Sequence, residues 1–321
     1  MTAPLTAPFP YPGGKSTAAG LVWERLGQVQ IYVEPFAGSA AVFLANPHRP
    51  VPVSETLGDL NGHVVNVWRA IRDHPDQVAL HASGMVSEAD LTARHLWLVN
   101  QTESIVDRLE SDPFWCDPRA AGWWIWGLSA WIGGGWCTGN GPWQTDGSRI
   151  VASNPGGPGV RRKVPAVGNA GKGTHAVGMR DGAVDRRFVE LAERLRHCRV
   201  LHSDWKETTL RAITSEKRSP VGVFLDPPYL PRAGMSTDGL YAAEVDTLDV
   251  YEWAAVHGRD ERFRIVVAGH DGDWVPPAGW TTERWTRPNG FGGSKSRGDR
   301  VECLWVSPHC HQNLQLFTHS G

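Results

Sequence analysis

The sequence predicts an α/β fold built on a mixed, mostly parallel β-sheet. Short apolar runs, such as residues 31–33 and 221–225, have the length and composition of buried strands, and an acidic residue follows each. Stretches with helical spacing of apolar residues alternate with these runs. The alternation stops between residues 76 and 186 and then resumes, which predicts an inserted unit. In open sheets of this kind, ligands bind beyond the carboxyl ends of the strands.

Length and composition limit the classes of function. The chain has 321 residues, enough for one large domain or two smaller ones, and a formal net charge of −2. Any basic surface for nucleic acid must therefore be local. The five cysteines lack CxxC spacing, so we expect neither a disulfide framework nor a metal site. The sequence shows no membrane helix and no secretion signal, so we expect a cytoplasmic protein.

The first segment with a chemical signature is residues 9–16, Phe-Pro-Tyr-Pro-Gly-Gly-Lys-Ser. Its end resembles a phosphate-binding loop, but it lacks the first glycine of a Walker A motif and no strand precedes it. What remains is an aromatic residue, a tight glycine turn that lets backbone approach a ligand, and Lys15. A helix is expected over residues 16–26, capped by Ser16 or Thr17.

The second segment, residues 30–44, has the form of a strand, a glycine turn and the start of a helix. Nucleotide-binding folds use this arrangement, although the GxGxxG spacing is absent. The first turn of the helix offers free N–H groups to a ligand. Glu34, at the end of the strand, could accept a hydrogen bond from a cationic amine. A bare strand–turn–helix unit without a ligand is the alternative.

A second strand is expected between residues 50 and 61, with Asp59 near its end. A carboxylate roughly 20 residues beyond the glycine turn is placed to bind ribose hydroxyls. Glu55 is the less well placed candidate for that position. A helix over residues 62–72 follows and ends before Pro75.

Residues 76–186 interrupt the α/β alternation. Residues 76–110 are predicted to be helical, and most of the seven tryptophans between residues 115 and 143 are expected to form the core of a small subdomain. Residues 147–180 are rich in Gly and Pro and contain no Asp or Glu. Such a loop can bind DNA phosphates, and a solvated, disordered loop is the alternative. Its cations are Arg149, Arg161, Arg162, Lys163, Lys172 and Arg180.

The alternation resumes near residue 185 with a helix and then a strand through residues 200–201. The strand is followed by Asp204, a carboxylate that could accept a hydrogen bond from an adenine amine, and by Trp205, which could flank a ring. Further on, a helix is expected over residues 247–257 and a strand over residues 264–268.

The tetrapeptide Asp226-Pro227-Pro228-Tyr229 follows the apolar run that ends at residue 225. Both prolines fix φ and lack an N–H donor, so the kink is rigid and its carbonyls are free to accept. A carboxylate, carbonyl acceptors and a flat ring together suit a planar group with an exocyclic amine, such as a nucleobase. A Pro-rich turn with an Asp cap is the structural alternative.

The last elements are two runs, residues 280–287 and 300–307, which are predicted to pair as a C-terminal β-hairpin. The connection between them is rich in Gly and basic, and it supplies two further candidates for DNA contact. They are Lys295 and Arg297.

Five of these motifs resemble, in the same order, those of N6-adenine-specific DNA methyltransferases of the DNA adenine methylase type, the alpha group. Each motif alone is weak, but five in family order are specific. One difference is Ala40, where such families often carry a second glycine, so we expect a slightly less open turn. The motifs are aromatic-x-Gly-Gly-Lys at 11–15, Glu-Pro-Phe-x-Gly at 34–38, Asp-x-Asn at 59–61, Asp-Pro-Pro-Tyr at 226–229 and Arg-x-Glu at 300–302.

The resemblance implies a Rossmann-like fold that uses S-adenosylmethionine as methyl donor. Residues 1–75 and 187–321 would form the catalytic domain, and residues 76–186 an inserted, mainly helical subdomain that recognises DNA. Glu34 would hold the methionine ammonium, Asp59 the ribose hydroxyls and Asp204 the adenine amine. The full set implied around the donor is Tyr11, Gly13, Gly14, Lys15, Glu34, Pro35, Phe36, Ala37, Gly38, Asp59, Asn61, Asp204 and Trp205.

The resemblance also implies in-line methyl transfer to N6 of an adenine flipped out of double-stranded DNA. The amine would bond to the Asp226 carboxylate and the Pro227 carbonyl, and Tyr229 would stack on the base. Enzymes of this kind can have a cognate restriction endonuclease as a partner, in a bacterial or phage-infected cell. Three alternatives remain: cytosine N4 methylation on the same fold, an RNA or nucleotide-modifying transferase, and a non-catalytic DNA-binding relative.

Overall fold

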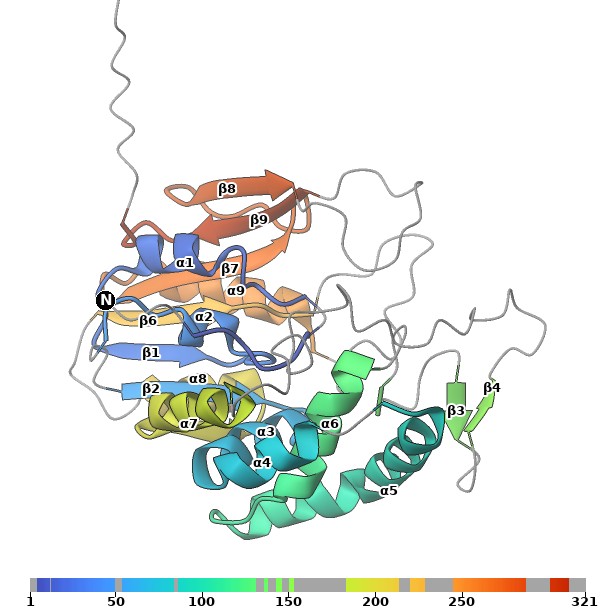
Figure 1. The fold of residues 1–321 in the computed structure, drawn as a ribbon. Coiled ribbons are helices and arrows are strands. Elements are labelled where there is room, and N and C mark those ends of the chain that lie inside the picture. Colours follow the sequence, from blue (N-terminus) through green and yellow to red (C-terminus); the bar gives the residue numbers. More distant parts are fainter. Residues whose placement is uncertain are drawn as a thin grey trace, which may run out of the picture.

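The computed structural model describes residues 5–11, 13–49, 54–83, 86–130, 136–137, 143–145, 150–152, 183–213, 220–228, 245–286 and 301–311. Within these residues the main sheet has seven strands in the order β5-β2-β1-β6-β7-β9-β8 (Figure 1). Its strands are β1 (Ile31–Glu34), β2 (Ser54–Asp59), β5 (Cys198–His202), β6 (Val221–Leu225), β7 (Phe263–His270), β8 (Thr281–Thr286) and β9 (Val301–Val306).

The sheet is mixed and mostly parallel, as predicted. The five strands from β5 to β7 are parallel, whereas β9 is antiparallel to both β7 and β8. The pairing of β8 with β9 confirms the C-terminal strand pair. β1 lies between β2 and β6, with Ile31 beside Ser54 and Val221. The carboxyl ends of these three strands therefore meet at one edge, where the sequence places Glu34, Asp59 and Asp226.

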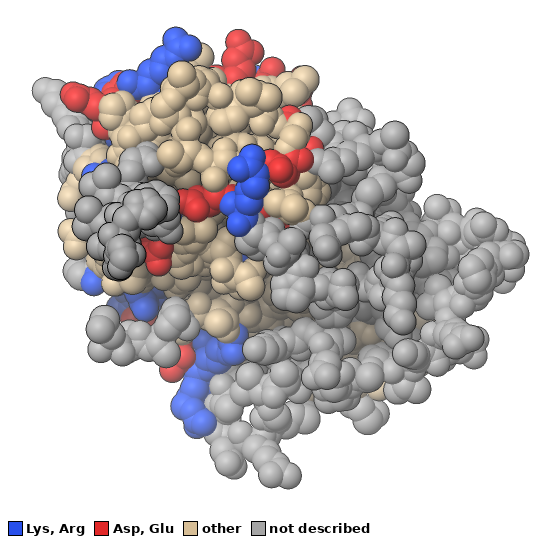
Figure 2. Space-filling view, turned by 90° about the horizontal axis from the view of Figure 1, so that it is seen from above, with Lys and Arg blue, Asp and Glu red and all other residues tan. Residues whose placement is uncertain are grey.

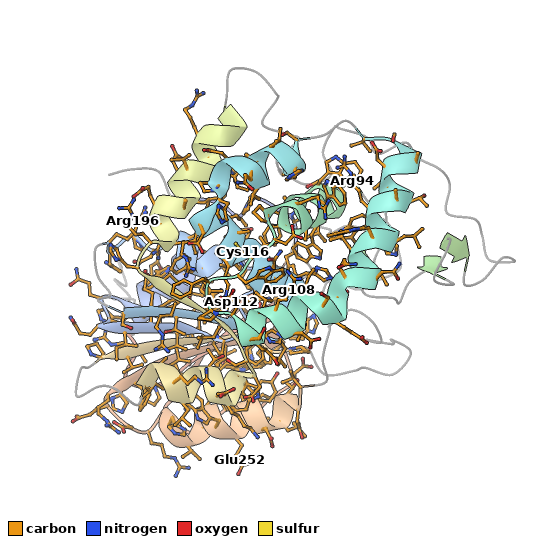
Figure 3. The ribbon with its side chains drawn as sticks, turned by 90° about the horizontal axis from the view of Figure 1, so that it is seen from below. Arg94, Arg108, Asp112, Cys116, Arg196 and Glu252 are labelled. Atoms are coloured by element: carbon orange, nitrogen blue, oxygen red, sulfur yellow. The ribbon has the colours of Figure 1, made fainter. Side chains whose placement is uncertain are left out.

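Helices cover both faces of the sheet (Figure 3). Residues that alternate along a strand point to opposite faces, so Ile31 and Val33 pack against α8 and α9 whereas Tyr32 packs against α1 and α3. This two-sided burial explains why residues 31–33 of β1 and the whole of β6 have no charged side chains. The helices are α1 (Ala19–Leu26), α2 (Ala41–Leu44), α3 (Gly62–Asp73), α4 (Pro75–Ala82), α5 (Glu88–Ser111), α6 (Pro118–Ala130), α7 (Ala183–Leu195), α8 (Trp205–Ile213) and α9 (Thr247–His257).

Helices α4 to α6 pack on α3, and one hydrophobic cluster extends from the sheet into them. It includes Trp68 of α3, Val78 of α4, Ile105 of α5 and Trp124 of α6. Arg108 and Asp112, labelled in Figure 3, mark the end of α5 that lies near the sheet. There Arg69 of α3 donates a hydrogen bond to the Leu109 carbonyl (3.1 Å), which satisfies one of the last carbonyls of α5. A separate two-stranded sheet consists of β3 (Trp143–Thr145) and β4 (Ile150–Ala152).

One predicted helix start is wrong. α1 begins at Ala19, and neither Ser16 nor Thr17 caps it; Ala18 is the N-cap and forms no side-chain bond there. The reason is that residues 16–18 belong to a turn that follows Gly13 and Gly14, in which the Ala18 N–H donates to the Lys15 carbonyl (3.0 Å). The stretch 76–110 is two helices, because Ser87 starts a second one by accepting a hydrogen bond from the Asp90 N–H.

Candidate functional site

A pocket lies at the carboxyl ends of β1, β2 and β6. The tetrapeptide contributes Asp226 and Pro228 to its wall. The residues predicted to surround a donor nearly all line it as well, and Asp204 is the exception among them. Those that line it are Tyr11, Gly13, Gly14, Lys15, Glu34, Pro35, Phe36, Ala37, Gly38, Asp59, Asn61 and Trp205. The fold therefore brings together segments that are far apart in the chain. Residues 11–61 supply one part of the pocket, and residues 205–228 supply another.

The glycine turn after β1 is shaped by close approach. Gly38 has φ of 45°, a left-handed conformation that favours glycine, and a Cβ there would come within 2.7 Å of the Tyr11 ring. Its N–H donates to Asp59 Oδ2 (2.9 Å), and its carbonyl accepts from the Trp68 indole (2.9 Å). The turn is thus fixed from three sides and holds the Tyr11 ring against its backbone.

Ala40 also has a left-handed backbone, with φ of 49° and ψ of 34°. It is the N-cap of α2 and is buried. An alanine in this conformation is strained, because its Cβ approaches the following carbonyl oxygen. The turn therefore adopts a glycine-like conformation without a glycine.

Glu34 ends β1 and is only 2% exposed. Its Oε2 accepts hydrogen bonds from the Tyr32 hydroxyl (2.8 Å) and from the Phe43 N–H in α2 (3.0 Å). Oε1 takes part in neither bond, and Glu34 lines the pocket. Burial raises the pKa of this carboxyl to about 8, although both hydrogen bonds favour the ionised form. A cation in the pocket would favour ionisation and lower this pKa again.

Asp59 ends β2 and joins the glycine turn to α3. Its Oδ1 accepts from the Asn61 N–H (2.8 Å) while Oδ2 holds Gly38. Asn61 in turn caps α3 by accepting from the His63 N–H (3.0 Å). Burial raises the pKa of Asp59 above its ordinary value, against the effect of these backbone bonds. Glu55, the weaker candidate, is instead bound by Arg194 at 2.5 and 2.6 Å in the core.

Lys15 and Asp226 form an ion pair across the pocket, with Nζ 2.8 Å from Oδ1. Lys15 is buried, and its ammonium also donates to the Gly13 carbonyl (2.6 Å). The pair therefore connects the N-terminal glycine turn directly to the end of β6. Burial strengthens such a contact because water screens it less.

The remaining tetrapeptide residues differ in position. Pro227 is buried, whereas Pro228 lines the pocket. Tyr229 lies outside the described residues.

Asp204 is exposed, and in the described chain it does not line the pocket. Its Oδ1 accepts from the Glu207 N–H (2.9 Å), so it caps α8. Its role toward an adenine amine stays a prediction. Trp205, the next residue, is buried, lines the pocket and meets Trp253 edge to face with ring centroids 6.1 Å apart.

All predicted DNA contacts lie outside the residues with described side chains: Arg149, Arg161, Arg162, Lys163, Lys172, Arg180, Lys295 and Arg297. On the face that Figure 2 shows, the coloured cations and acids are intermixed. The described residues contain no cluster of three or more metal-ligating side chains, and none of their helices has the length and apolarity needed to span a membrane.

Sequence reasoning missed five pocket residues: Ser39, Ala41, Leu60, Phe224 and Val245. Leu60 is the middle residue of the motif at 59–61, and Ser39, Ala41 and Phe224 lie within three residues of other motifs, so a wider window around each motif would have included them. Val245 gives no such signal, because it lies just before α9 and reaches the pocket only through the fold.

Residues 11–101 match the family model of D12 class N6 adenine-specific DNA methyltransferases. No curated protein matches the chain. The matched segment contains Lys15, the glycine turn, Glu34 and Asp59, and it ends before the tetrapeptide.

Proposed function

We propose that the chain is an N6 adenine-specific DNA methyltransferase, because residues 11–101 match the family model of the D12 class, and that it takes the methyl group from S-adenosylmethionine. The target is N6 of an adenine flipped out of double-stranded DNA. The observation that carries the proposal is the shared pocket, in which Asp226 lies with Glu34 and Asp59. Donor and acceptor base would thus bind side by side, as in-line transfer requires.

The chemistry of the pocket suits this donor. Glu34 Oε1 can accept from the methionine ammonium, and Asp59, at the end of β2, can accept from the ribose hydroxyls. Because Gly38 has no Cβ, the Tyr11 ring lies directly against the glycine turn, and both residues line the space that the ligand would fill. Trp205 offers an aromatic face to the adenine ring. When bound, S-adenosylmethionine supplies a methyl group on sulfonium that needs no further activation.

The enzyme's task is then to make a poor nucleophile attack. An exocyclic amine is conjugated with its ring, so its lone pair is not available in the ground state. Asp226 would accept one amine hydrogen and the Pro227 carbonyl the other, which frees the lone pair. Lys15 favours the ionised Asp226, the form that accepts. We propose that the same carboxylate takes the proton that the nitrogen loses after transfer.

The base must leave the duplex to reach this pocket, at a cost of a few kcal/mol. We propose that the acid-free segment 147–180 and the loop with Lys295 and Arg297 bind the DNA backbone while the base is flipped out.

We further propose a Rossmann-like catalytic domain of residues 1–75 and 187–321, with residues 76–186 as the recognition insert. A cytoplasmic location in a bacterial or phage-infected cell, and a cognate restriction endonuclease, belong to the same proposal.

The test compares DNA methylated by the wild type with DNA treated with Asp226→Ala. Labelled DNA is digested to nucleosides, which are identified by mass spectrometry. The wild type should give N6-methyladenine, and the variant should lower the rate by about 10²- to 10⁴-fold, the range for a lost proton acceptor. Asp271→Ala is a matched control, because Asp271 follows β7 and is also paired with a cation, Arg284 (3.0 Å).

Three outcomes would contradict the proposal. If N4-methylcytosine is the sole methylated nucleoside, the target base is cytosine. If the labelled methyl group is found on RNA alone, the protein is an RNA methyltransferase. A wild type that binds DNA but never transfers label would be a binding protein. Undiminished methylation by Asp226→Ala would remove the catalytic assignment alone.

A further inference from the structure

The start of α9 touches the tetrapeptide. Thr247 is 4% exposed, and its hydroxyl donates a hydrogen bond to the Pro228 carbonyl at 2.6 Å. We propose that Thr247 is a positioning residue for methyl transfer, which holds the Pro228 peptide so that the Asp226 carboxylate and the Pro227 carbonyl meet the target amine correctly. This inference rests on the proposed function.

The tetrapeptide needs such an anchor because the sheet no longer holds it. Pairing of β6 with β7 ends at Leu225, opposite Val267. Beyond that point the prolines cannot donate backbone hydrogen bonds, so partners can reach these residues only through their carbonyls. Thr247 supplies a donor where the backbone offers only an acceptor.

Two contacts fix the segment from its two ends. Lys15 pairs with the Asp226 carboxylate, and Thr247 holds the Pro228 carbonyl. Both prolines have a fixed φ, and each peptide unit is planar, so few torsions remain between these points. The Pro227 carbonyl, which we propose as the second acceptor for the amine, lies between them.

Thr247 is itself well fixed. A β-branched side chain has restricted χ1, and Thr247 stands in the first turn of a helix. Asp246 caps that helix by accepting from the Leu248 N–H (2.9 Å). Val250 and Ala254 then bury α9 against the sheet. The position of the hydroxyl is therefore set by the hydrophobic core.

The experiment measures kcat and KM for Thr247→Val, which removes the hydroxyl but keeps the shape, and for Thr247→Ser, which keeps the hydroxyl. Misplacement of a reacting group can lower rates by up to about 10²-fold, so we expect Thr247→Val to lose about 10- to 100-fold in kcat. KM for S-adenosylmethionine should change by less than about twofold, because donor binding is not involved. Thr247→Ser should recover most of the lost kcat.

Thr209→Val is the matched control. Thr209 is 2% exposed, and its hydroxyl also donates to a backbone carbonyl at 2.6 Å, that of Trp205 within α8. It should shift the melting temperature about as much as Thr247→Val while leaving kcat near the wild-type value. This comparison separates the effect of losing a buried hydrogen bond from the effect of misplacing the Pro228 peptide.

The outcomes distinguish this inference from the proposed function. If the wild type transfers no methyl group, the proposed function fails. If the wild type is active and Thr247→Val keeps its kcat, or if Thr247→Ser is as impaired as Thr247→Val, the inference is overturned. An equal fall in kcat for Thr209→Val would overturn it too. Should Thr247→Val not fold, Thr247→Ala against Thr247→Ser makes the same comparison.

Discussion

At the scale of single residues, Glu34 combines deep burial with a place in the pocket wall. Without a ligand its pKa is about 8, so it is mostly protonated at neutral pH. A bound ammonium would favour the carboxylate, and the pKa would fall. Binding of a cationic donor should therefore release a proton near pH 7.

We predict that the affinity for S-adenosylmethionine rises between pH 6 and pH 7.5 in the wild type more steeply than in Glu34→Gln. The affinity rises with pH because fewer protons must be displaced from Glu34 as the pH approaches its pKa of about 8. Calorimetric titrations in buffers of different ionisation enthalpy give the number of protons released. Equal proton release by both proteins would show that Glu34 does not bind the ammonium.

Single residues also show what the sequence could reveal of the site. Glu34 was predictable because it ends an apolar run in a parallel sheet, where strand ends converge, and Asp59 because of its spacing after the glycine turn. Asp204 fits the same rule, yet its carboxylate caps α8, since a strand-end carboxylate can serve either the pocket or the next helix. Thr247 gave no signal, because its contact with Pro228 depends on how α9 meets β6.

At the scale of elements, most strands and helices were predictable, and the start of α1 was not. Apolar periodicity located α3 and α9 well. Ser16 and Thr17 were expected to open α1, but they lie in a turn closed by the hydrogen bond from the Ala18 N–H to the Lys15 carbonyl. The start of α2 is the other irregular point, because Ala40 has a left-handed backbone there.

We predict that Ala40→Gly leaves the free energy of unfolding within about 0.5 kcal/mol of the wild type, or raises it. Relief of about 1–2 kcal/mol of left-handed strain offsets the lost methyl burial and the greater freedom of glycine in the unfolded chain. Ala70→Gly is the comparison, since Ala70 is equally buried but lies in regular α3. It should lose about 1–2 kcal/mol. Urea unfolding of both variants gives the values; equal losses would mean that Ala40 is not strained.

At the scale of the whole molecule, the proposed function requires a nearly neutral protein to bind a polyanion. The net charge is −2, and the face in Figure 2 mixes both signs. Affinity for DNA then depends on a few local cations, for which the acid-free segment 147–180 is our candidate.

We predict that the combined variant Arg161→Gln, Arg162→Gln and Lys163→Gln weakens DNA binding similarly for all sequences. If each residue contacts one phosphate, the slope of log affinity against log salt should become shallower by about 2.7, or 0.9 per contact. Fluorescence anisotropy at several salt concentrations gives the slope.

The control replaces three exposed cations, Arg196, Arg199 and Arg211, with glutamine. They lie at the ends of α7, β5 and α8 that are remote from the carboxyl ends of the strands. An unchanged slope for this control and a changed slope for the loop variant support the proposal. The same slope in both would mean that the loop acts only through net charge.

The order of strands in the sheet has a consequence for synthesis of the protein. β1 pairs early in the chain with β2, but its other neighbour, β6, is made only after most of the protein. A nascent chain that stops before residue 221 leaves that edge of β1 without a partner, and open edges of this kind associate with other chains. The tetrapeptide directly follows β6, so the residues proposed to bind the donor, which are the glycine turn, Glu34 and Asp59, are synthesised long before the residues proposed to act on the base. The pocket can therefore be complete only after synthesis has passed Val245.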